Sequence, residues 1–144
     1  MGVHLGCLIA IAATMVPLLA EEPSKSPAWS RFRGDNGQGV VAECNVPLPW
    51  SEADVRWSID LPGKGNGSPV VHGNKIFLLS GDPQTADRFM LCYDLTTGKE
   101  LWRETAPSQP HHLHTRSSYA SGTPCVNEDA VFVSWADPES HILK

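Results

Sequence analysis

The chain has 144 residues, a formal net charge of −5 and 41% hydrophobic residues, which is enough for one ordinary domain. Sixteen acidic residues outnumber eleven basic ones, and no basic block occurs anywhere in the sequence. This balance argues against nucleic acid as a partner.

Residues 1–20 are predicted to be a secretory signal peptide. They contain no Asp, Glu, Lys or Arg, and the apolar stretch Leu5–Leu19 is followed by the small residue Ala20. A membrane-spanning helix is the alternative, but this stretch is shorter than the ~20 residues that a bilayer requires. We therefore expect cleavage after Ala20 and export to the periplasm or the extracellular space, with membrane contact through the signal alone.

Two segments without regular structure are expected after the signal. Residues 21–28 are rich in Pro, Ser and Glu and predict a flexible leader, because they contain too few apolar side chains to pack. Residues 29–54 begin with Trp29 and Phe32, followed by three glycines within the next seven residues. Two anchoring aromatic side chains among glycines predict an irregular N-terminal segment pinned to a larger body.

Residues 55–144 consist of short β-like runs separated by turn residues, with no amphipathic helix of useful length. The runs of the first half are Val55–Leu61, Ser68–His72, Lys75–Ser80, Phe89–Tyr93 and Glu100–Glu104. The pattern predicts an all-β fold in which consecutive runs pair as hairpins.

An internal repeat supports this interpretation. The runs Gly67–Val71, Ile76–Phe77 and Asp82–Pro83 recur as Gly122–Val126, Val131–Phe132 and Asp137–Pro138, each at an offset of 55 residues. A shared offset indicates consecutive copies of one supersecondary unit. The second copy continues through residues 130–135 to a run at 141–144, where the sequence ends before the turn that the first copy has at residues 94–98.

The run Cys92–Trp102 carries the most specific signal in the chain. Asp94 and Thr97 can hydrogen-bond the turn backbone, Gly98 can supply a positive φ, and Trp102 follows four residues later. These residues resemble the tryptophan-docking motif A-x-D-x-x-T-G-x-x-x-W of pyrroloquinoline-quinone-like (PQQ-like) propeller repeats, with Cys92 where the family usually has Ala.

The opening Trp29–Gly34 is similar to the W-x-x-F-R-G opening of exported bacterial propellers of this family. The resemblance implies a partial β-propeller of four-stranded antiparallel blades, with one complete blade and parts of its neighbours, as the N-terminal part of a larger ring. Blades bury their faces against each other, so a chain with so few of them should not be stable alone. Trp57 resembles part of the outer strand of a blade whose other strands come from a C-terminal region.

We therefore expect the chain to pair with the missing remainder of the propeller or with a protein partner, because exposed strand edges at both ends favour pairing or aggregation. Removal of the signal leaves Cys44, Cys92 and Cys125, which allow at most one disulfide. Cys92 and Cys125 lie in predicted strands, and we interpret both as small buried apolar side chains.

A histidine cluster is the best candidate for a metal site. His111, His112 and His114 lie within four residues, and the side chains of His112 and His114 can share a face of an extended chain. The cluster belongs to an insertion of ten residues after Trp102, expected on the same face as the 81–88 loop, which offers Asp82 and Asp87. Two histidines that share a face are fewer than the three or four ligands of a tight site, so we favour the alternative, a polar, solvated insertion in which one histidine packs between blades.

No catalytic residue can be named, because the sequence contains neither a recognisable carboxylate pair nor a nucleophile motif. The first hypothesis is a non-enzymatic exported propeller that acts as a scaffold or binding module and needs no cofactor. The alternative is part of a quinoprotein dehydrogenase that oxidises an alcohol or sugar with PQQ and calcium. For that enzyme, the resemblance implies calcium ligands, a catalytic Asp and a vicinal cysteine pair, none of which can be placed on this chain.

Overall fold

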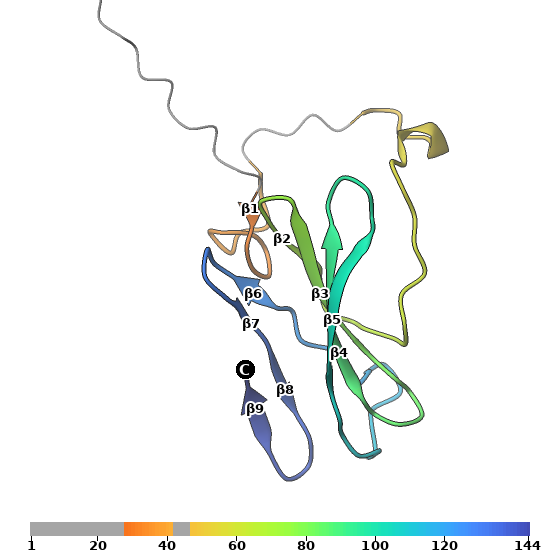
Figure 1. Cartoon of the computed structure of the whole chain (residues 1–144), viewed down its shortest axis with the longest axis vertical. Coiled ribbons are helices and arrows are strands. Elements are labelled where there is room, and N and C mark those ends of the chain that lie inside the picture. The colour runs from red at the N-terminus through yellow and green to blue at the C-terminus, as the bar shows by residue number, and fades with distance from the viewer. Residues whose placement is uncertain (1–27, 42–46) are drawn as a thin grey trace, which may run out of the picture.

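The computed structural model describes residues 28–41 and 47–144 (Figure 1). This described part contains nine β-strands, one 3₁₀-helix and no α-helix. No helix within it is long and apolar enough to cross a membrane. The predicted signal peptide, nearly all of the predicted leader and Cys44 lie outside the described residues.

The first blade forms as predicted. Its four antiparallel strands are the middle and outer members of a five-stranded sheet with the order β1-β2-β3-β4-β5. The blade consists of β2 (Val70–His72), β3 (Lys75–Gly81), β4 (Arg88–Asp94) and β5 (Glu100–Ala106), and the fifth strand of the sheet, β1 (Ala28–Trp29), pairs with β2. The antiparallel sheets do not close into a ring, which agrees with the predicted all-β fold of a partial propeller.

The second blade forms two short antiparallel hairpins. Its strands are β6 (Cys125–Val126), β7 (Val131–Phe132), β8 (Ser134–Ala136) and β9 (His141–Leu143). The predicted strand at 130–135 is divided at Val133, whose main-chain N–H and carbonyl bond the carbonyl and N–H of Lys144 at 2.9 and 3.0 Å. The division occurs because β7 pairs with β6, whereas the chain from Val133 onward pairs with β9.

The core lies between the two blades. Alternate side chains of the first blade, including Val70, Phe77 and Cys92, are at most 5% exposed and pack with Val126 of the second blade. A second cluster joins Leu79 to Val133 in the same way. The period-2 alternation of each strand places these side chains on one face of its sheet, so one blade buries its face only because the other covers it.

Three aspartates shape the turns at the ends of strand pairs. The carboxylate of Asp94 accepts hydrogen bonds from the main-chain N–H and the hydroxyl of Thr97 at 2.7 and 2.8 Å, and Gly98 has φ +70°. Asp82 and Asp137, which are related by the repeat, each accept main-chain N–H bonds two and three residues later. The repeat in the sequence is therefore also a repeat in turn geometry.

The Asp94 turn gives the protein a predictable pH dependence. Bonds donated by Thr97 hold the pKa of Asp94 below its ordinary value of 3.8. A lowered folded-state pKa means that the stabilisation is complete above the unfolded-state pKa and is lost as the pH falls through the folded-state pKa. We expect Asp94→Asn to lower the urea midpoint at neutral pH, and the difference from the wild type to shrink below about pH 4.

The matched control for this turn is Asp60→Asn, at an exposed carboxylate that forms no hydrogen bond with any described residue. It should leave the urea midpoint nearly unchanged at every pH. A difference between wild type and Asp94→Asn that stays constant down to about pH 2 would show that the carboxylate charge is not what holds the turn.

The predicted strand Val55–Leu61 is wrong. After the 3₁₀-helix η1 (Glu52–Asp54) this segment runs without a ladder partner among the described residues, and Val55, Ile59 and Leu61 stay exposed. Trp57 is the exception, because its indole N–H donates to the carbonyl of Leu95 at 3.1 Å. A Cβ on Gly98 would lie 2.7 Å from the Trp57 ring, so the glycine lets the indole dock on the turn.

Strand β1 was not predicted from the sequence. Ala28 and Trp29 pair with His72 and Val71 of β2, and the carbonyl of Ser30 accepts a bond of 2.8 Å from the N–H of Val126 in β6. Figure 1 shows β1 close to both β2 and β6. The start of the N-terminal segment therefore covers the free edge of the first strand in each blade.

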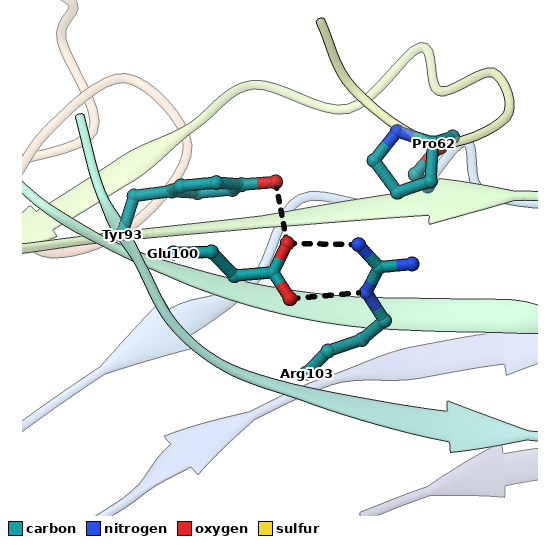
Figure 2. Close-up of polar contacts among 5 residues, drawn as sticks. Pro62, Tyr93, Glu100 and Arg103 are labelled. Carbon is teal, nitrogen blue, oxygen red and sulfur yellow. Dashed lines mark hydrogen bonds and ion pairs between the residues drawn. The ribbon is translucent and has the colours of Figure 1, made fainter. Parts of the chain in front are cut away.

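A surface network ties the outer strand of the first blade to its neighbour (Figure 2). Arg103 donates two hydrogen bonds to the carboxylate of Glu100, and the hydroxyl of Tyr93 donates to the same carboxylate at 3.4 Å. The bonds from Arg103 hold the pKa of Glu100 below its ordinary value, and burial raises the pKa of Tyr93. Arg103 and Glu100 are partly exposed, with 38% and 36% of their side chains accessible, whereas Tyr93 is buried, so the network belongs to the blade framework.

The two described cysteines differ in burial. Cys92 is completely buried, and burial raises the pKa of its thiol, in agreement with the predicted role of a small apolar side chain. Cys125 is exposed, so the same interpretation was wrong for that residue. The repeat relates Cys125 to the completely buried Val70, which faces the second blade, whereas no described residue covers the corresponding face of the second blade.

Candidate functional site

The histidine-bearing insertion lies where its position between two blades predicts. Residues 107–121 run from the end of β5 to the segment before β6. The N–H of Ser108 donates to the carboxylate of Asp87 at 3.2 Å, so the insertion lies against the 81–88 loop as expected. The insertion and a loop of the first blade therefore meet at one end of the first sheet.

Tyr119 gives the insertion its shape. Its hydroxyl donates to the carbonyl of His111 at 2.9 Å and accepts from the N–H of the same residue at 3.1 Å. The two rings also meet edge to face, with centroids 5.0 Å apart. His111 is thus the histidine of the cluster that packs within the insertion, and its main chain is fixed by a single side chain.

Arg88 connects the insertion to both blades. This first residue of β4 is 2% exposed, and each nitrogen of its guanidinium donates one hydrogen bond. The acceptors are the carbonyl of Tyr119 at 3.1 Å, the hydroxyl of Ser108 at 3.0 Å and the carbonyl of Ala136 at 2.9 Å. The ring of Trp135 lies 5.7 Å from the guanidinium carbon.

All three acceptors of Arg88 are neutral, and no carboxylate within the described part of the chain lies close enough to form an ion pair with it. Its charge interacts through space with Asp137, whose pKa is lowered by bonds from Ser140 and Glu139 and also by Arg88. Because no ion pair is formed, the hydrogen bonds of Arg88 carry much of the compensation for burying its charge. The positive charge of Arg88 is therefore buried beside the insertion and is not part of the exposed surface.

A cleft of about 530 Å³ opens between the insertion and the 137–140 turn of the second blade. Arg88 lines it together with His111, two carboxylates, three prolines and Ile142. The carboxylates are Asp137 and Glu139, and the prolines are Pro107, Pro110 and Pro138. This volume lies within the ~300–1,000 Å³ range of ligand sites. Seven of its eleven lining residues are polar, so the cleft is more polar than most small-molecule pockets.

The predicted metal candidates do not assemble into a metal centre. His112 and His114 are exposed, and the Asp82 carboxylate accepts bonds from its own turn. Within residues 28–41 and 47–144, no group of three or more His, Cys, Asp or Glu side chains could hold a metal ion. The motif residues Cys92, Asp94, Thr97 and Gly98 lie in the blade core and its turn, and Trp102 packs against Phe77 with ring centroids 6.0 Å apart.

Arg88 and the cleft were missed by sequence reasoning. The one local signal was a charged residue at the start of the otherwise apolar strand Arg88–Tyr93, a position that also fits a solvated strand end. The three acceptors lie 20, 31 and 48 residues away along the chain, so no local pattern could have revealed them.

The comparison with protein families gives one match. A family model described as outer membrane protein assembly factor BamB, of the PQQ-like repeat type, matches residues 50–134. The matched residues cover more than half of the chain and include the complete blade, the insertion and the first strands of the second blade. No match was found among curated proteins or among solved structures.

Proposed function

The chain belongs to the PQQ-like repeat family described as outer membrane protein assembly factor BamB, and on this premise we propose that it is an exported, non-enzymatic propeller protein that acts as a scaffold or binding module. Its blades form part of a larger ring, and the predicted signal peptide directs it to the periplasm or the extracellular space. The cleft beside Arg88 is its binding site.

The non-enzymatic part of this proposal rests on residues 28–30, which cover the first strands of both blades. In a propeller the first strand of each blade faces the central channel. Residues 28–30 bond the free edges of β2 and β6, which are the first strands of their blades. This contact supports a central channel that residues 28–30 occupy at the first two blades. The alternative function, a quinoprotein dehydrogenase, would need that space for a quinone and calcium.

The exposed face of the second blade supports the larger ring. The repeat relates Val70 and Phe77, which are 0% and 5% exposed, to Cys125 and to Phe132, which is 42% exposed. The first pair is buried because the second blade covers it. A further blade of the same repeat, packed in the same way, would bury the second pair.

Titration with PQQ and calcium tests the functional class. The purified protein, followed by tryptophan fluorescence, is expected to show no saturable change when both are added, and no oxidation of alcohols or sugars above the rate without protein. Calcium alone serves as the control for ionic effects. Saturable binding of the quinone together with substrate turnover would replace the scaffold by the dehydrogenase.

A further inference from the structure

We propose that the cleft beside Arg88 binds an extended segment of a partner protein that carries a lysine or arginine side chain. The inference rests on the proposed binding function and names the chemistry of its ligand. It follows from the hydrogen-bonding capacity of Arg88, from the charges at the rim of the cleft and from the character of its walls.

Arg88 can donate more hydrogen bonds than the protein uses. A guanidinium has five N–H groups. Three of them bond Tyr119, Ser108 and Ala136, and the remaining two have no acceptor among residues 28–41 and 47–144. The side chain is 2% exposed and is one of the residues that line the cleft, so the cleft is the route by which an acceptor from outside the chain can approach the guanidinium. A main-chain carbonyl of a bound segment is such an acceptor.

The rim of the cleft selects against an anionic ligand. Two carboxylates, Asp137 and Glu139, line the cleft with the single guanidinium of Arg88. Asp137 already accepts bonds from Ser140 and from the N–H of Glu139, whereas the side chain of Glu139 is exposed and forms no bond with any described residue. A cation at the rim together with a neutral carbonyl at Arg88 therefore fits the charges better than a free carboxylate would.

The walls favour an extended chain with an aliphatic stem. Pro107, Pro110 and Pro138 have no main-chain N–H, so they present apolar and rigid surface. Ile142, which is half-buried in β9, adds a further apolar contact. Lysine and arginine carry long methylene stems that pack on such surface while the charged end stays at the rim. The net charge of −5 on this chain also attracts a basic partner over longer distances.

The test uses two blocked peptides, acetyl-Ala-Lys-Ala-Lys-Ala-amide and the same peptide with Glu in place of Lys, titrated into the full chain by NMR or calorimetry. The lysine peptide is expected to bind about tenfold more tightly than the glutamate peptide, and its affinity should fall as salt is added. The diamine cadaverine, which has the cationic stem without a carbonyl, should bind more weakly than the lysine peptide.

Glu139→Gln is the variant of choice, because the Glu139 side chain takes no part in the fold. This variant is expected to lower the affinity for the lysine peptide about two- to fivefold. Glu128→Gln, at an exposed glutamate that does not line the cleft, is the matched control and should leave the affinity unchanged.

Equal affinity for both peptides, or equal binding by wild type and Glu139→Gln, overturns the inference. So does cadaverine binding as tightly as the lysine peptide, since Arg88 would then contribute nothing. These outcomes are distinct from failure of the proposed function, which would appear as quinone binding and turnover whatever the peptides do.

Discussion

Gly67→Ala is expected to push the two blades apart and to destabilise the protein by about 3 kcal/mol. A Cβ on Gly67 would collide with the carbonyl oxygen of Gly122, which is its counterpart in the repeat. The position of a Cβ is fixed by its own backbone, and the oxygen belongs to the main chain of Gly122, so no side-chain rotation relieves the collision. The N–H of Ser68 also bonds the hydroxyl of Thr123 at 2.9 Å, and this bond would lengthen as the blades separate.

Gly73→Ala is the matched control for the blade junction. Gly73 has φ +57°, but a Cβ there would meet no heavy atom within 4 Å. The expected cost is therefore the strain of a left-handed alanine, about 1 kcal/mol. Urea unfolding followed by tryptophan fluorescence measures both variants. Similar midpoints for the two would mean that the contact of Gly67 with Gly122 does not hold the blades together.

Arg88→Lys is expected to cost about 2–3 kcal/mol and to loosen the insertion. Lysine keeps the positive charge, but one ammonium group cannot reach the three acceptors that the planar guanidinium bonds in three directions. Two of those acceptors are main-chain carbonyls, at Tyr119 and Ala136. The variant leaves at least one of them without a partner while the charge stays buried.

Arg103→Lys provides the comparison for Arg88. Arg103 bonds Glu100 through two nitrogens, but 38% of its side chain is exposed to solvent. Water can replace the lost bond there, so the urea midpoint should change little. Limited proteolysis with trypsin adds a local measurement, because the exposed Arg116 lies in the insertion and should be cut faster in Arg88→Lys. Unchanged cleavage and stability would show that Arg88 does not organise the insertion.

The features that sequence predicted correctly depend on local chemistry. Asp94, Thr97 and Gly98 lie within five residues, and a turn is decided by the side chains that it contains. The repeat of Asp82–Pro83 at Asp137–Pro138 was also recognised in the sequence, and the structure adds that both aspartates accept the same turn hydrogen bonds.

The features that sequence missed depend on partners far along the chain. The run Val55–Leu61 alternates as a strand does, yet it has no partner strand among the described residues and stays extended. Strand β1 forms only because the edge of β2 is free, and the sequence of Ala28–Trp29 does not predict this pairing. Burial of Cys125 was predicted from its strand, whereas burial in a blade requires a neighbour on that face.

The candidate site shows the same limit. The neighbourhood of the insertion and the 81–88 loop could be predicted from strand order alone, and the bond between Ser108 and Asp87 confirms it. The three hydrogen bonds of Arg88 could not be predicted, because they join elements of both blades. The number of histidines suggested a metal site, but His112 and His114 belong to no group of three or more possible metal ligands in the described part of the chain.

The central claim is that a further blade covers the second blade in the working protein, and thiol labelling of Cys125 tests it most directly. N-ethylmaleimide is added to cells that produce the working protein and, separately, to the purified 144-residue chain. Mass spectrometry of the peptide that contains Cys125 then reports the labelled fraction. Cys92, which is completely buried, is the internal control. We predict rapid labelling of Cys125 in the purified chain and protection in cells until denaturant is added. Equally rapid labelling of Cys125 in both samples would contradict the account.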